Sequence, residues 1–152
     1  MATVDVRCIE GVLCELEQIE SDARKTLALL DLQGAELSVL MVDDAFMRPL
    51  NLQYRGQDKT TDVLSFGQQE GLVDPAGCAP GLLLGDIVIS VQTATRQAHE
   101  RGTAVASELR VLLVHGVCHL LGHDHETDDE ADVMQELEQR LLKSLVGVDC
   151  GG

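Results

Sequence analysis

Three histidines near the end of the chain are the residues whose types and spacing most directly suggest chemistry. His115 and His119 are four residues apart, so on a helix both imidazoles project from one face. Gly122 follows three residues later, and glycine takes the positive φ that ends a helix and turns the chain. Such a turn would return His125 to the same point. Three neutral imidazoles form a site for one divalent ion, with zinc the expected metal and one coordination position left open for catalysis.

The spacing matches the pattern H-E-x-x-H-x-x-G-x-x-H of the metzincin peptidases, with one decisive difference. Those enzymes have glutamate after the first histidine as general base, whereas this chain has Gly116, which cannot accept a proton. His123 competes with His125 as third ligand, and the metzincin-like interval favours His125. Cys118 points about 100° away from His119 around the helix, so we interpret it as a core residue and not a ligand.

Outside the histidine segment, Arg55 is the side chain of greatest chemical interest. An isolated arginine is most often a solvated loop charge. The alternative is a guanidinium aimed at a phosphate or a developing oxyanion. The carboxylates of Asp62 and Asp86, in strand-like segments, either hydrogen-bond a loop or orient a histidine ring. Asp124 is the carboxylate nearest in sequence to the metal and could orient a ligand or influence bound water. Asp86 and Asp124 are weak candidates for a general base.

Composition points to one folded domain. The chain has 152 residues, 45% of them hydrophobic, with one tyrosine, two phenylalanines and no tryptophan, so aliphatic packing must fill the core. No uncharged apolar run reaches 18 residues and no signal peptide begins the chain, which predicts no membrane span. The five cysteines are odd in number and scattered, as expected for reduced thiols in a cytoplasmic protein.

A formal net charge of −15 argues against a protein that coats nucleic acid. It leaves room for an enzyme that meets RNA at a local basic patch, or one to which a ribosomal partner delivers the substrate. The candidate cations for such a patch are Arg48, Arg55, Lys59, Arg96 and Arg101.

Hydrophobic periodicity predicts the elements that must position these residues. The expected strands are 4–8, 36–42, 61–66 and 82–90, the last interrupted at Gly85. The expected helices are 12–30, 43–54, 91–101, 104–121 and 127–147, with the last opened by a T-x-x-E capping box and closed by Gly147. Pro49 must open the second helix late or kink it.

The last helix is expected to place Val133, Leu137, Leu141 and Leu145 on one apolar stripe. The whole order predicts a single α+β domain over residues 1–152. A small mixed four-stranded sheet would pack with about five helices, and the metal site would lie at the end of a central helix.

Three segments resemble the YbeY-type endoribonucleases, which are bacterial ribosomal-RNA maturation factors. They are LNLQYRG (50–56) with TDVLSF (61–66), LGDI (84–87) and HGVCHLLGHDH (115–125). Their order and spacing match, and the resemblance spans nearly the whole chain. Departures are Cys118 where the family often has leucine, His123 where it often has tyrosine, and Gly67 where it usually has proline.

The resemblance implies a single metal-dependent hydrolase domain with one zinc ion on His115, His119 and His125, and with Arg55 as the functional arginine. It implies cleavage of single-stranded or precursor RNA in small-subunit (16S) ribosomal RNA maturation and in ribosome quality control, with the small subunit or assembly proteins as partners. The attacking group is either water or the 2′-hydroxyl of the RNA. Two alternatives remain, a metzincin-like metallopeptidase and a noncatalytic ribosome-assembly factor with a structural metal.

Overall fold

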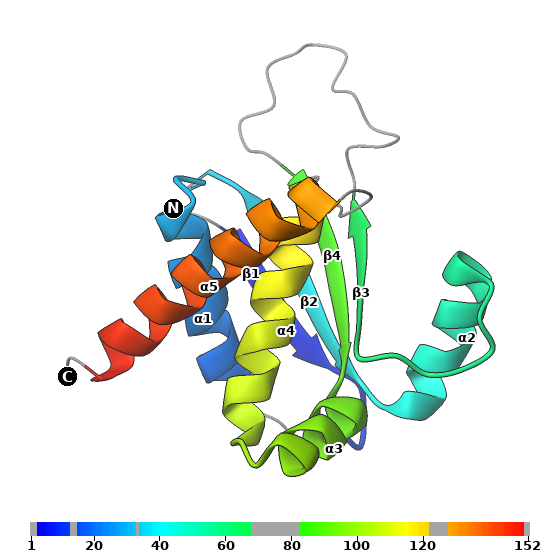
Figure 1. The fold of residues 1–152 in the computed structure, drawn as a ribbon. Helices are drawn as coiled ribbons and strands as arrows, with labels where there is room; N and C mark the ends of the chain where they lie inside the picture. The colour runs from blue at the N-terminus through cyan, green and yellow to red at the C-terminus, as the bar shows by residue number, and fades with distance from the viewer. Residues whose placement is uncertain (1–2, 13–14, 33, 68–82, 122–127, 151–152) are drawn as a thin grey trace, which may run out of the picture.

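The computed structural model describes residues 3–12, 15–32, 34–67, 83–121 and 128–150, which form four strands and five helices (Figure 1). The elements in chain order are β1 (Thr3–Cys8), α1 (Leu16–Leu29), β2 (Glu36–Val42), α2 (Asp44–Arg55), β3 (Val63–Gly67), β4 (Leu83–Ser90), α3 (Val91–Arg101), α4 (Val105–Leu120) and α5 (Asp128–Cys150). The predicted α+β class and the strand and helix counts are confirmed.

The sheet has the order β1-β2-β4-β3, in which β1, β2 and β4 are parallel and the edge strand β3 is antiparallel to β4. Central β4 is buried on both faces, which explains its nearly continuous hydrophobic run. The predicted interruption at Gly85 is a register shift against β2. Gly85 has a φ of +137°, and a Cβ there would collide with the carbonyl oxygen of Phe66, so only glycine fits.

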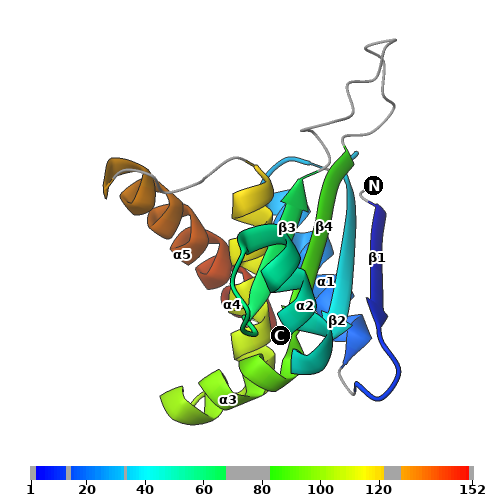
Figure 2. The same cartoon turned by 90° about the vertical axis from the view of Figure 1, so that its right-hand side faces the viewer.

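The helices cover the two faces of the sheet unequally. Helices α1 and α4 pack on one face, α5 packs on α4 and α1 as an outer layer, and α2 lies on the other face (Figures 1 and 2). The histidine helix α4 is central, as predicted, because it contacts α1, α3, α5, β3 and β4.

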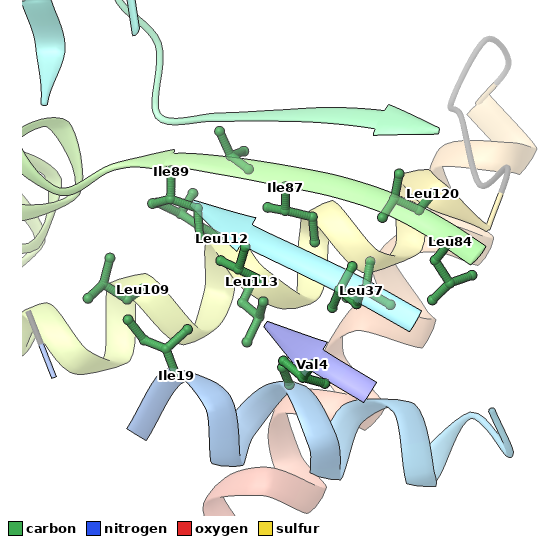
Figure 3. Close-up of a cluster of buried hydrophobic side chains, with 14 of the residues drawn as sticks. Val4, Ile19, Leu37, Leu84, Ile87, Ile89, Leu109, Leu112, Leu113 and Leu120 are labelled. Atoms are coloured by element: carbon green, nitrogen blue, oxygen red, sulfur yellow. The ribbon is translucent and has the colours of Figure 1, made fainter. Parts of the chain in front are cut away.

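The core between the sheet and helices α1 and α4 is aliphatic, as the composition predicts (Figure 3). Its members include Val4, Ile19, Leu37, Leu84, Ile87, Ile89, Leu109, Leu112, Leu113 and Leu120. Burying each such side chain contributes about 1.5–3 kcal/mol relative to exposure, so this layer is the main source of stability for α4.

Three details of the helices differ from the prediction. Helix α1 begins at Leu16, four residues later than expected, and α5 continues past Gly147 to Cys150. Within α5, Val133 is 56% exposed, whereas Met134 is 2% exposed and occupies the core position that the stripe assigned to Val133. The cause is tertiary: the α5 side chains that pack on α4 are Met134, Leu141 and Leu145, with Leu137 partly buried.

Pro49 lies inside α2, five residues after the first helical residue. Its ring removes the hydrogen bond that would join position 49 to the carbonyl of Ala45. Both residues are exposed, so the lost bond costs less than it would in the core.

Among the described residues, no single helix has the length and apolar composition to cross a membrane. Among these residues, α3 and α4 have the required length and apolar composition only when they are taken together, and the two helices meet at a bend of 117°.

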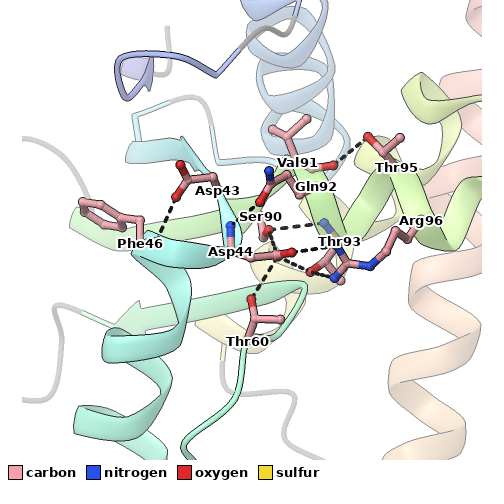
Figure 4. A network of polar contacts seen from close by, with 10 residues as sticks. All are labelled: Asp43, Asp44, Phe46, Thr60, Ser90, Val91, Gln92, Thr93, Thr95 and Arg96. Carbon is pink, nitrogen blue, oxygen red and sulfur yellow. Dashed lines mark hydrogen bonds and ion pairs between the residues drawn. The ribbon is translucent and has the colours of Figure 1, made fainter.

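The carboxylate of Asp44 ties the first turn of α2 to its surroundings (Figure 4). It accepts hydrogen bonds from the hydroxyls of Ser90 and Thr93, each at 2.6 Å, and of Thr60 at 3.0 Å. The Arg96 guanidinium donates to its other oxygen at 2.6 Å. Burial raises the pKa of Asp44, but the four hydrogen bonds outweigh burial and lower it to about 2.

This network predicts a specific acid sensitivity. The pKa of Asp44 is 3.8 in the unfolded chain and about 2 in the folded one, so its stabilisation is fully present above pH about 4 and is lost as pH falls toward about 2. We expect D44N to be less stable at neutral pH and to show a shallower fall in the free energy of unfolding over this window, measured by urea denaturation. The exposed carboxyl substitution E136Q is the control, and a D44N profile parallel to the wild type would contradict the network.

Candidate metal centre

His115 and His119 converge near the end of α4, as their spacing predicts. Their Nε2 atoms are 3.0 Å apart, with ring centroids at 4.5 Å and ring planes at 69°. In a tetrahedral zinc site with Zn–N bonds of 2.0–2.1 Å, two ring nitrogens lie about 3.3 Å apart. Both rings are half-buried, so the pair fits two adjacent ligands of one ion reached from the surface.

Glu138 on α5 holds the ring of His115. Its Oε1 atom lies 2.5 Å from Nδ1 of His115 and accepts the ring proton there. With Nδ1 protonated, Nε2 carries the lone pair that a metal requires, and a carboxylate behind a histidine is the usual support for a metal ligand. Glu138 lies 23 residues from His115, and no local spacing marked it, because the contact depends on how α5 packs against α4.

The predicted third ligand, His125, lies outside the described residues, as do its rival His123, the candidate base Asp124 and Gly122. Within the described ranges, no group of three or more histidine, cysteine, aspartate or glutamate side chains could hold a metal. Helix α4 ends at Leu120, close to the predicted end at 121.

Cys118 is a core residue, as predicted. It is fully buried and packs with Met134 and Leu141 on the α5 side of α4. Burial, helped by the negative charge of Glu138, raises the pKa of its thiol to about 12. The sulfur therefore stays protonated at neutral pH, which disfavours metal binding because the thiolate is the ligand.

Gly116 is the point at which α4 touches the sheet most closely. A Cβ at this position would lie 3.0 Å from both Cδ1 and Cγ2 of Ile87, which is fully buried on β4. The Gly116 carbonyl also accepts a hydrogen bond from the hydroxyl of Ser65 on β3 at 3.2 Å. The Cβ of a glutamate here would press against Ile87, which would have to shift by a few tenths of an ångström. The general base of the metzincin peptidases is therefore missing from a position that is also tightly packed.

Arg55 is the last residue of α2 and is exposed. It lines a cavity of about 980 Å³ on the sheet face opposite α4, together with Tyr54, Phe66 and Asp86. The described lining of this cavity does not include the histidine pair.

Strand β3 separates Arg55 from the two imidazoles. On one side, the ring of Tyr54 meets that of Phe66 with centroids 4.7 Å apart. On the other side, Ser65 contacts Gly116 of α4. Arg55 and the histidines therefore flank the same edge strand without forming one contact cluster.

Most of the predicted basic patch is neutralised. Three of its five cations form ion pairs at 2.6–2.8 Å: Arg48 with Asp58, Arg96 with Asp44 and Arg101 with Glu108. Within the part of the chain that the structure describes, Arg55 and Lys59 have no such partner. Asn51, which the sequence did not single out, donates from its buried amide to the Lys59 carbonyl at 2.8 Å and fixes the turn between these two cations.

The two remaining carboxylates occupy different settings. Asp62 accepts hydrogen bonds from the backbone of Val63 at 2.7 Å and from Gln97 at 3.2 Å, which fits the loop-bonding role considered for it. Asp86 lines the cavity beside Arg55, on the sheet face away from α4.

Comparison with known proteins identifies related sequences and a solved structure of similar fold. The sequence model of the family described as Endoribonuclease YbeY matches residues 9–146. An Endoribonuclease YbeY of Pelotomaculum thermopropionicum is 51% identical over 114 residues, covering 74% of each chain. A chloroplastic Endoribonuclease YBEY of Arabidopsis thaliana is 50% identical over 114 residues, which are 74% of this chain and 19% of that longer protein. The solution structure of TM1509 from Thermotoga maritima matches the fold with a TM-score of 0.68 and 23% identity, covering 98% of this chain and 93% of that one.

The close approach at Gly116 predicts a measurable coupling with Ile87. Overpacking costs about 1–3 kcal/mol, more than the roughly 1 kcal/mol that alanine gains over glycine in a helix. We therefore expect G116A to lower the free energy of unfolding. The loss should shrink by at least about 0.5 kcal/mol in an I87V background, which removes one of the two nearest atoms. If the changes in unfolding free energy caused by G116A and I87V are strictly additive, the contact between positions 116 and 87 does not limit how closely α4 packs on the sheet.

Proposed function

The chain belongs to the Endoribonuclease YbeY family, and from this premise we propose that it is a metal-dependent endoribonuclease specific for single-stranded RNA. The domain, residues 1–152, acts in the cytoplasm in small-subunit (16S) ribosomal RNA maturation and ribosome quality control. Its substrate is precursor ribosomal RNA, met on the small subunit or with assembly proteins. The observation that carries the proposal is the convergence of two imidazole nitrogens at 3.0 Å, with Glu138 behind one of them.

The metal of this proposal is one zinc ion held by His115, His119 and His125. The donor set fits zinc because neutral imidazoles are among its preferred ligands, and three of them leave a position for substrate. A zinc ion bound there would supply Lewis-acid catalysis, lowering the pKa of a water toward neutrality and polarising a phosphoryl oxygen.

Two residues of the chain have further roles in the proposed reaction. Glu138 keeps the proton of His115 on Nδ1 and so keeps Nε2 available as a donor. Arg55 offers a guanidinium with no carboxylate partner among the described residues, suited to a phosphate whose charge grows during cleavage. Because Arg55 and the histidines lie on either side of β3, the RNA strand must pass the end of this edge strand to meet both.

The attacking group can be read from the products. Cleavage by water leaves a 5′-phosphate, whereas attack by the 2′-hydroxyl of the RNA leaves a cyclic phosphate. Analysis of the end groups formed from a labelled single-stranded substrate distinguishes the two.

The other two candidate functions are less well supported. A metzincin-like peptidase needs a base at the position of Gly116, which has no side chain and packs tightly against Ile87. A noncatalytic assembly factor with a structural metal would not need Arg55. Incubation with unfolded casein tests the first alternative, and the Arg55 substitution below tests the second.

The role of Glu138 predicts weaker metal binding when its charge is removed. Loss of a carboxylate that supports a metal-ligating histidine typically lowers metal affinity by about 10- to 100-fold. We expect E138Q to show this loss in a competition titration with a chromophoric zinc chelator, while E136Q, an exposed glutamate on the same helix, keeps wild-type affinity. Equal affinities for the two variants would remove Glu138 from the site. Elemental analysis should find one zinc ion per molecule of the untagged wild-type protein and almost none in H119A.

Arg55 can be compared with a second arginine on the same helix. We expect R55A to fold normally and to cleave single-stranded RNA about 10²- to 10³-fold more slowly, the usual cost of losing a group that stabilises transition-state charge. R48A is the matched control, since Arg48 is also exposed but is paired with Asp58 at 2.8 Å. Circular dichroism checks the fold of both variants. Wild-type cleavage rates in R55A would favour the noncatalytic alternative.

A further inference from the structure

Every aromatic side chain of this protein lies in one place. The sequence has one tyrosine, two phenylalanines and no tryptophan. Tyr54, Phe46 and Phe66 all line the cavity of about 980 Å³ between α2 and the sheet, which we call the α2 groove. Phe46 is 40% exposed and Tyr54 is 58% exposed. Phe66 is partly buried and packs against the core residues Leu64 and Val88, whereas Phe46 and Tyr54 are exposed and their place on an open surface requires another explanation.

The way α2 packs leaves these rings open. Phe46, Leu50 and Tyr54 are four residues apart and line the groove from one side of the helix. Only Met47 and Asn51 of α2 are buried, so this helix stands away from the sheet along the rest of its length. The sheet below contributes Leu40, Leu64, Phe66 and Val88 to the lining.

One ring in the groove is held in position. Tyr54 meets Phe66 edge to face, with ring planes at 65° and centroids 4.7 Å apart. This is a favourable arrangement for an aromatic pair and is worth about as much as a weak hydrogen bond. It orients the tyrosine ring while leaving more than half of the residue accessible.

Four charged side chains of the described residues line the groove, namely Asp5, Arg7, Arg55 and Asp86. Asp86 already has an interaction partner, and Arg55 is the side chain that favours an anion. Arg55 follows Tyr54 directly and lines the same cavity without an ion-pair partner among the described residues. The other arginine of the groove, Arg7, is paired with Asp5 at 2.9 Å. An exposed aromatic face next to an unpaired guanidinium suits a ligand that is both planar and anionic.

An unstacked nucleotide has both properties. Proteins bind single strands by stacking bases on aromatic side chains and by placing cations along the backbone. A duplex cannot use such a surface, because its bases are already stacked on each other. A peptide supplies a planar ring and an anion only on separate side chains, whereas a nucleotide carries the ring and the phosphate in one unit.

We propose that the α2 groove binds single-stranded RNA next to the cleavage site, with a base stacked on Tyr54 and a neighbouring phosphate at Arg55. The inference rests on the proposed ribonuclease function and deepens it, since it makes the groove the source of the preference for single strands. Tyr54 is a substrate-binding residue in this scheme and takes no part in bond cleavage.

The test measures stacking directly. A short single-stranded oligoribonucleotide containing 2-aminopurine loses fluorescence when that base stacks on a ring. The titration is done at low salt with the full-length protein in excess EDTA, so that no cleavage occurs. We expect quenching by the wild type and by Y54F. The apparent Kd should rise on the order of tenfold in Y54A, from the loss of one stacked base.

A matched control lies on the same helix. Leu52 is 48% exposed but does not line the groove, so L52A should bind like the wild type. A duplex carrying the same reporter base should cause little quenching. Equal binding by Y54A and L52A, or equal quenching with the duplex, would overturn the proposal. Displacement of the probe by an unfolded polypeptide but not by unlabelled RNA would identify the groove as a protein-binding surface instead.

The proposal that the α2 groove binds RNA and the proposal of ribonuclease activity can be rejected independently of each other. Quenching that depends on Tyr54 in EDTA supports the groove even if the protein proves unable to cut RNA. If Y54A cleaves single-stranded RNA at the wild-type rate and the wild-type protein does not quench the probe, the ribonuclease function stands and the groove is rejected.

Discussion

The contact between Gly116 and Ile87 sets the position of α4, and most of the molecule follows from it. Because position 116 has no side chain, the helix lies directly against β4, and Ser65 on β3 bonds to its carbonyl. This fixes the rotation of the helix. One face of α4 then enters the core under the sheet, with Leu112, Leu113 and Leu120. A second face, with Val114 and Cys118, packs against α5. The two imidazoles remain half-buried at the surface, where Glu138 contacts His115. The residue that removes the peptidase base is therefore the one that positions the histidines.

Helix α2 is held on the opposite face by polar contacts more than by apolar burial. At its first turn, Asp44 gathers hydrogen bonds from residues near or within β3, β4 and α3. Toward its other end, Asn51 secures the following turn, while Tyr54 and Arg55 remain open to solvent. The helix packs on the sheet through Met47, with Leu50 partly buried, and a cavity remains open beside Tyr54 and Arg55. The low pKa of Asp44 shows how strongly its surroundings favour the charged carboxylate.

The structure shows which of the few cations on this acidic protein are available to bind a phosphate. A net charge of −15 repels RNA as a whole, and ion pairing removes Arg48, Arg96 and Arg101 as free cations. Of the candidate cations, Arg55 and Lys59 are left for a phosphate, and Arg55 lines the groove that contains the exposed rings. A surface of this kind gains its affinity from stacking at one place and gains little from long-range attraction. It would discriminate against duplex RNA and against non-specific polyanion binding, as suits a nuclease that must spare most of the RNA around it.

The sequence by itself determined the elements and the pairing of His115 with His119, because strand alternation, helical spacing and helix capping act over a few residues. Asp43 caps α2 by accepting a hydrogen bond from the backbone N–H of Phe46, and aliphatic residues fill the core as the composition predicts. Only the tertiary structure decided that Met134 and not Val133 enters the core, and that Glu138 supports His115. It also decided that carboxylates pair with three of the candidate cations, and that the tyrosine and the two phenylalanines line one groove. Each of these depends on which faces of distant elements meet, and that is set by the packing of α4 and α2 on the sheet, which no local pattern encodes.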